Sequence, residues 1–212
     1  YSVHSMGADR DFEQEDRIAA TNFAQAAAEA NGWTLLSDSS WPGYSDLSHS
    51  LMEGYTVFMA EADRQISAPT HIFLQAGVGG LAGAAAAMAR KLWGDAPVIV
   101  VVEPQYAPAL HGCIQAGDFV PAKGPGSAMG RLDCLEASLI ALKGLAKDAD
   151  VFALISEEEG QAGADYAAAH QMESTASGAA GLAALLASPA HRAALKLDAN
   201  SHVLVILSEG PE

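Results

Sequence analysis

A glycine-rich turn separates a strand-like segment from a strongly helical one near residue 77. It reads Phe73-Leu74-Gln75-Ala76-Gly77-Val78-Gly79-Gly80-Leu81-Ala82-Gly83. Residues 70–74 are apolar, which predicts a strand, and the alanine-rich residues 82–92 predict a helix. Glycine lets a backbone approach a ligand closely, and a helix N-terminus offers free N–H groups to an anion. The order strand, glycine loop, helix therefore predicts a phosphate-binding loop.

Further strand-like and helix-like segments alternate along the chain. Apolar runs at 97–102, 151–155 and 202–207 predict strands, together with a short one at 33–36. Helical spacing is found at residues 11–30, 47–66, 107–116, 135–146, 161–171 and 177–186, and a last helix is expected from Pro189. The strands lack two-residue alternation, which is typical of strands buried on both faces. The sequence thus predicts an α/β fold with a largely parallel sheet covered by helices on both faces.

Charge and composition narrow the classes of ligand. The chain of 212 residues carries 26 acidic and 11 basic residues, a net charge of −15. Such a surface repels nucleic acid and anionic membranes, and no apolar run is long enough to span a bilayer. The two cysteines lack metal-ligand spacing, so no metal site is expected. The N-terminus is polar and lacks a signal-peptide core, which favours a cytoplasmic protein. A small-molecule ligand is expected.

The glycine loop alone leaves three interpretations open. It is a tight turn without a ligand, a dinucleotide site or another phosphate site. Gly77-Val78-Gly79-Gly80-Leu81-Ala82 satisfies the pattern G-x-G-x-x-[GA], and Glu103 ends the next strand, where a ribose-binding carboxylate belongs. Under that interpretation the dinucleotide contacts are Gly77, Gly79, Ala82 and Glu103.

Other short segments, in order along residues 20–212, point to one family. They are Asn31-Gly32-Trp33, Asp38, Trp41-x-Gly43-Tyr44, Met52-x-Gly54-Tyr55, Leu74-Gln75-Ala76-Gly77-Val78-Gly79, Val102-Glu103-Pro104, Ser177-Gly178-Ala179-Ala180-Gly181-Leu182 and Val205-Ile206-Leu207-Ser208-Glu209-Gly210. With these segments the chain resembles the fold-type-II pyridoxal-phosphate enzymes, whose architecture is like that of the tryptophan synthase β subunit. Within that family it is most similar to the diaminopropionate ammonia-lyases.

The resemblance implies a cofactor and roles for individual residues. The cofactor is pyridoxal 5'-phosphate, whose phosphate is held by the loop N–H groups of Gly77, Val78, Gly79, Gly80 and Leu81. Ser208, after the last strand, meets the pyridine nitrogen through a neutral hydroxyl. Asp38 takes the place of a catalytic aspartate that removes the proton from Cα of one substrate enantiomer. A turn-forming role is the alternative for Ser208 and Asp38, and a helix-capping role is the alternative for Glu103.

One departure from the family pattern concerns the lysine that binds the cofactor. The family binds the cofactor aldehyde through a lysine in an Asn-x-Phe-Lys segment, which an Asp-Gly-Asn-His loop follows, and neither segment occurs here. The five lysines, at positions 91, 123, 143, 147 and 196, match nothing catalytic. We therefore expect residues 1–37 to be a remnant of the small domain and residues 38–212 the C-terminal part of the large cofactor-binding domain. The architecture is expected to be incomplete at the N-terminus, as a fragment or a degenerate paralogue.

The resemblance also implies a reaction. It is α,β-elimination of ammonia from 2,3-diaminopropionate, giving pyruvate and ammonia, in a homodimer with a small amino-acid substrate. Serine/threonine dehydratase and hydroxyaspartate ammonia-lyase activities are alternatives on the same fold. A dinucleotide-binding domain and a non-catalytic remnant are alternatives of another class.

Overall fold

The computed structural model describes residues 14–210. The chain divides into two compact units, residues 1–37 and residues 38–212. This division falls at the boundary expected from the sequence. The identification of the two units as a small-domain remnant and part of a large domain stays a prediction.

The first unit contains one described helix, α1 (Gln14–Asn31). The helix ends where Gly32 takes a φ of +65°, which lets the N–H of Trp33 donate to the carbonyl of Ala28 at 2.9 Å. The predicted start at residue 11 lies outside the described residues. The strand predicted at 33–36 is wrong, because residues 33–37 form no strand. Trp33 and Leu36 are 50% and 65% exposed, and no neighbouring strand is present among the described residues of this unit to pair with them.

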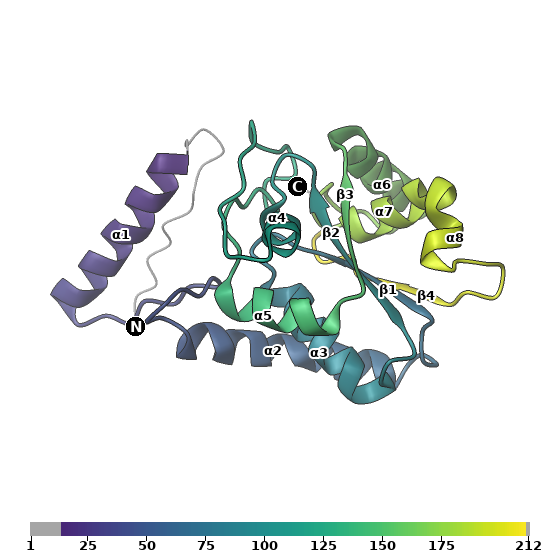
Figure 1. Ribbon diagram of the computed structural model, residues 1–212, viewed down its shortest axis with the longest axis horizontal. Coiled ribbons are helices and arrows are strands. Elements are labelled where there is room, and N and C mark those ends of the chain that lie inside the picture. Colours follow the sequence, from purple (N-terminus) through teal and green to yellow (C-terminus); the bar gives the residue numbers. More distant parts are fainter. Residues whose placement is uncertain (1–13, 211–212) are drawn as a thin grey trace. The chain divides into compact units, whose positions relative to one another are not determined.

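The second unit is built on a four-stranded parallel sheet (Figure 1). Its strands are β1 (His71–Gln75), β2 (Val98–Pro104), β3 (Val151–Ile155) and β4 (Val203–Val205), in the order β3-β2-β1-β4. In register, Phe73 of β1 pairs with Val100 of β2 and with Val205 of β4. The parallel sheet predicted from the sequence is confirmed. Because all strands run the same way, their carboxyl ends meet at one edge.

Helices cover both faces of this sheet (Figure 1). On one face lie α2 (Asp46–Asp63), α3 (Gly80–Trp93), α4 (Ala109–Ala116) and α5 (Leu139–Asp148). On the other lie α6 (Glu157–Ala169) and α7 (Ala180–Ala187), followed by a 3₁₀ turn (Ser188–His191) and α8 (Arg192–Leu195). Two apolar cores result. Ile72 and Leu74 of β1 belong to the first and Phe73 to the second.

Two helices begin four residues away from their predicted starts. α5 begins at Leu139 and not at residue 135, because residues 135–138 are tied to other segments: the carbonyl of Leu135 accepts from Ala122, and the N–H of Ser138 donates to Val78. α6 begins at Glu157, four residues early. Ser156 forms a capping box there with Glu159, and this signal outweighs the weakly apolar first turn.

Candidate functional site

The glycine loop connects β1 to α3 at the carboxyl edge of the sheet. Gly79 is the N-cap of α3, with a φ of +98° and no side-chain capping bond. No acceptor in the described part of the chain takes a hydrogen bond from the N–H groups of residues 77–81. Buried N–H groups normally have a partner, and the helix end adds positive potential. The loop therefore offers an anion several N–H donors, as expected for a phosphate site.

Gly77 allows a second segment to approach the loop closely. A Cβ on Gly77 would lie 2.9 Å from the carbonyl oxygen of Arg131 and 3.0 Å from Sγ of Cys134. Residues 131–134 therefore form one wall of the loop. Gly79 and Gly80 are buried, whereas residues 77, 78 and 81 are only half-buried. The loop is thus walled on one side, and three of its five residues keep part of their surface exposed.

The segment just before this wall, residues 127–129, is anchored to α6. Glu157, in the first turn of α6, accepts hydrogen bonds from the hydroxyl of Ser127 and the N–H of Ala128, both at 2.7 Å. Met129 is 1% exposed and lies against Gly160, where a Cβ would come within 2.8 Å of its sulfur. This segment is therefore held by polar and apolar contacts from the opposite face of the sheet.

Ser208 lies beside the start of the loop. It follows β4, the strand next to β1, and its Oγ accepts a hydrogen bond from Nε2 of Gln75 at 3.0 Å. Gln75 is the last residue of β1, two positions before Gly77. Ser208 is exposed. The structure thus brings together the loop and the serine that the sequence assigns to one site.

Asp38 reaches the same region through its backbone. Its carbonyl oxygen would lie 3.6 Å from a Cβ on Gly80, so the chain at residue 38 passes the N-terminus of α3. The residue itself is exposed. Nearby, Trp41 and Tyr44 stack with ring centroids 4.3 Å apart and form an antiparallel bridge. The role of Asp38 as a base stays a prediction.

A buried pair of serines fixes the segment after Asp38 to the loop. Ser40 and Ser138 have their hydroxyl oxygens 2.8 Å apart, and Ser40 Oγ also accepts from the N–H of Ile140 at 2.9 Å. The N–H of Ser138 in turn donates to the carbonyl of Val78 at 2.9 Å. We call this pair of serines the Ser40 clamp. The sequence alone does not predict it, because the two serines are 98 residues apart.

We expect Ser40→Ala to lower the free energy of unfolding by about 1–2 kcal/mol, because it leaves the N–H of Ile140 without its acceptor. Urea unfolding monitored by circular dichroism measures the change. Ser50, exposed on α2, is the matched control, and its alanine variant should unfold like the wild type. Equal stabilities of Ser40→Ala and Ser50→Ala would contradict the clamp.

Glu103 is fully buried at the end of β2. Its two carboxylate oxygens accept from the N–H groups of Leu110 and His111, both at 2.7 Å, in the first turn of α4. Burial raises the pKa of Glu103 to about 7, although the two N–H donors act in the opposite direction. The carboxylate of Glu103 therefore caps a helix, which is the alternative role that the sequence analysis gives it.

The dinucleotide interpretation does not fit this geometry. Glu103 is 0% exposed and both its oxygens accept from α4, so a ribose does not reach them. Ala82, another of its expected contacts, is 0% exposed. Gly77 and Gly79 still belong to an anion site, but Glu103, the carboxylate that would bind the ribose of a dinucleotide, caps α4 instead.

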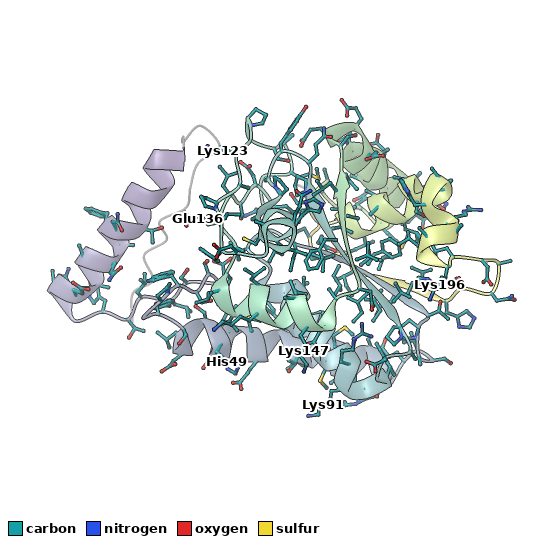
Figure 2. All side chains as sticks on the ribbon, viewed as in Figure 1. His49, Lys91, Lys123, Glu136, Lys147 and Lys196 are labelled. Carbon is teal, nitrogen blue, oxygen red and sulfur yellow. The ribbon has the colours of Figure 1, made fainter. Side chains whose placement is uncertain are left out.

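The five lysines lie on the protein surface. All five are exposed, and four of them, Lys91, Lys123, Lys147 and Lys196, are labelled on outer helices and loops in Figure 2. Within residues 14–210, no group of three or more histidine, cysteine or acidic side chains is arranged to hold a metal ion. No helix in that range combines the length and apolarity needed to cross a membrane.

Comparisons with known proteins agree with this site. Residues 2–209 match the family model described as pyridoxal-phosphate dependent enzyme. A diaminopropionate ammonia-lyase of Salmonella typhimurium (strain LT2) is 32% identical over 212 residues, which cover 90% of this chain and 52% of that protein. The chain thus spans about half the length of the curated relatives it matches.

Solved structures show the same relationship. The crystal structure of diaminopropionate ammonia lyase from Escherichia coli, in complex with an aminoacrylate-PLP azomethine reaction intermediate, superposes with a TM-score of 0.84 at 27% identity, over 94% of this chain and 54% of that one. Maize serine racemase shares the fold, with a TM-score of 0.77 at 18% identity, over 96% and 59% of the two chains. The family predicted from the short motifs is confirmed. The chain belongs to the family of pyridoxal-phosphate dependent enzymes.

Proposed function

We propose that this chain forms the phosphate-binding and pyridine-binding part of a lyase that eliminates ammonia from 2,3-diaminopropionate. The observation that carries the proposal is the glycine loop, whose N–H groups at residues 77–81 have no acceptor in the described protein and which lies beside Ser208. The similarity to diaminopropionate ammonia-lyases supports this choice of substrate.

The residues present fit the proposed cofactor. The N–H groups of Gly77, Val78, Gly79, Gly80 and Leu81 would hold its phosphate, because they are uncapped and lie at the N-terminus of a helix of 14 residues. When bound, pyridoxal phosphate supplies an electron sink for the bond cleavage at the substrate. The wall formed by residues 131–134 keeps the loop in shape.

Ser208 would bind the pyridine nitrogen through a neutral hydroxyl. A hydroxyl does not enforce protonation of that nitrogen as a carboxylate would, so the ring withdraws electrons less strongly. This weaker withdrawal suits elimination of a β-substituent better than chemistry that needs a long-lived carbanion. The position of Ser208 beside the loop supports this role.

Asp38 would act as the base that removes the Cα proton of one substrate enantiomer. Its backbone passes Gly80, and the Ser40 clamp fixes the segment that follows it. An exposed carboxylate becomes a suitable base when substrate binding excludes water around it. If Asp38→Asn released pyruvate from both enantiomers at the wild-type rate, this role would be wrong.

The reaction is tested with this chain joined to the lysine-bearing segment of its family, by incubating the protein with pyridoxal phosphate and 2,3-diaminopropionate and following pyruvate with lactate dehydrogenase. We expect pyruvate from 2,3-diaminopropionate in preference to serine, threonine or 3-hydroxyaspartate. Preference for one of the hydroxy amino acids would favour the dehydratase or hydroxyaspartate lyase alternatives. Cofactor binding without pyruvate from any of the four would support a non-catalytic remnant.

Assembly and location follow the same proposal. We propose a cytoplasmic homodimer, in keeping with the two free cysteines, Cys113 and Cys134. Sedimentation equilibrium measures the oligomeric state. A monomer at micromolar concentration would contradict it.

A further inference from the structure

Tyr55 lies on the face of α2 that packs against the first turn of α3. Its Cε2 would lie 3.9 Å from a Cβ on Gly80, which is the first residue of α3 and belongs to the glycine loop. Cε2 is bonded to the ring carbon that carries the hydroxyl. Tyr55 therefore brings a phenol beside the loop, from a helix that contributes none of the loop's N–H groups.

The packing of α2 on α3 sets the direction of this ring. Met52, in the first half of α2, lies against Gly83 of α3. Asp63, the last residue of α2, accepts from Nε1 of Trp93, the last residue of α3, at 2.8 Å. The two helices therefore run the same way. Because a side chain on a helix leans toward the N-terminus of that helix, the ring of Tyr55 extends toward the N-terminal end of α3.

The hydroxyl of Tyr55 is not used inside the described protein. Within residues 14–210 it makes no hydrogen bond to another residue. The side chain is half-buried, and its oxygen is not among the buried atoms of that range that lack a partner, so the hydroxyl reaches solvent. One O–H donor beside the glycine loop is therefore open to a ligand.

Helix α2 is fixed in place without this hydroxyl. Ser48, in its first turn, is 0% exposed and donates from Oγ to the carbonyl of Ser39 at 2.6 Å. Met59, also 0% exposed, belongs to the apolar core. Tyr55 lies between these two anchors. Loss of its hydroxyl alone should therefore leave the fold intact.

We propose that Tyr55 binds the phosphate group of the ligand, as a donor in addition to the N–H groups of the glycine loop. The inference rests on the proposed function, which supplies the phosphate monoester. Ser208 meets the chain at Gln75, before the loop, whereas Tyr55 meets it at Gly80, so the phenol lies on the phosphate side of the ligand. A phosphate has three strongly accepting oxygens, so it takes this donor together with the backbone donors.

Tyr55→Phe removes the hydroxyl and keeps the ring over Gly80. We expect this variant to bind inorganic phosphate and pyridoxal phosphate about 10- to 100-fold more weakly than the wild type, because a hydrogen bond to a charged group is lost. Equilibrium dialysis gives the dissociation constants. Tyr166→Phe is the matched control, because Tyr166 is 42% exposed on α6, across the sheet from α2. The control should bind both ligands like the wild type.

A second variant separates binding from packing. Tyr55→Leu removes the ring together with the hydroxyl. If Tyr55 only packs against Gly80, Tyr55→Phe will bind both ligands like the wild type and only Tyr55→Leu will bind them more weakly, and this result would overturn the inference. A Tyr55→Phe variant that loses affinity for pyridoxal phosphate alone would overturn it too, because the hydroxyl would then touch another part of the ligand.

A measurement on the unsubstituted protein covers the case in which the variants do not fold. With isotope-labelled carbon at Cζ of the tyrosines, the resonance of Tyr55 should shift when inorganic phosphate binds, and that of Tyr166 should not. An unchanged Tyr55 resonance with phosphate bound would overturn the inference alone. A wild type that binds neither inorganic phosphate nor pyridoxal phosphate would overturn the proposed function, and the inference with it.

Discussion

Gly79→Ala is expected to weaken binding of pyridoxal phosphate on the order of 100-fold. Gly79 has a φ of +98°, in the left-handed region that an alanine adopts only with strain, and its new Cβ would meet Cδ1 of Leu110 at 3.0 Å. The backbone at the head of α3 must then turn, and N–H groups of the loop turn with it. Loss of one hydrogen bond to a charged group, about 1.5–3 kcal/mol, gives this loss of affinity.

Equilibrium dialysis with pyridoxal phosphate and with inorganic phosphate measures the effect of Gly79→Ala. The matched control is Gly112→Ala in α4, where a Cβ meets nothing within 4 Å. The control should bind both ligands like the wild type. If Gly79→Ala bound them as tightly as Gly112→Ala, the loop would not be the phosphate site.

Glu103→Gln is expected to change how stability depends on pH. The pKa of Glu103 is about 7 in the folded protein and near 4.5 when unfolded, so between these values the folded state binds more protons. The contribution of Glu103 to the free energy of unfolding is therefore full below pH 4.5 and is lost as pH rises through 7. The loss amounts to about 3 kcal/mol.

Glutamine does not titrate, so the free energy of unfolding of Glu103→Gln does not fall in this way as pH rises. Relative to the wild type, Glu103→Gln should be less stable at pH 5, because its amide replaces one of the two acceptor oxygens. By pH 8 its free energy of unfolding should have risen by about 3 kcal/mol relative to that of the wild type. Urea unfolding at several pH values gives the difference. The exposed Glu136, which Figure 2 labels, is the control, and Glu136→Gln should not show this rise in stability over the wild type between pH 5 and pH 8.

Much of the fold follows from local patterns in the sequence. The apolar residues 70–74 and the alanine-rich residues 82–92 predict β1 and α3, because burial and helix propensity act within a few residues. The same locality explains the error at 33–36, since an apolar run becomes a strand only where another strand pairs with it. A glycine at position 79 was also predictable, because a tight turn before a helix favours glycine.

The contacts that shape the site are not local. The Ser40–Ser138 pair and the bond from Gln75 to Ser208 join residues 98 and 133 positions apart. Polar side chains in such pairs follow no period, so their partners appear only in the folded chain. One signal was nevertheless present, since Gln75 is a polar residue closing the apolar strand His71–Gln75. Buried amides of this kind need partners.

The pairing of β1 with β4 has a consequence for folding. These neighbours in the sheet are far apart in sequence, and Thr70 already bonds to His202, 132 positions away. Closing so long a loop is entropically unfavourable, and contacts of high sequence separation slow folding. We therefore expect β1 to pair first with β2, which is nearer in sequence, and β4 to bring Ser208 beside the loop late. Ligand affinity should then be the last property recovered during refolding.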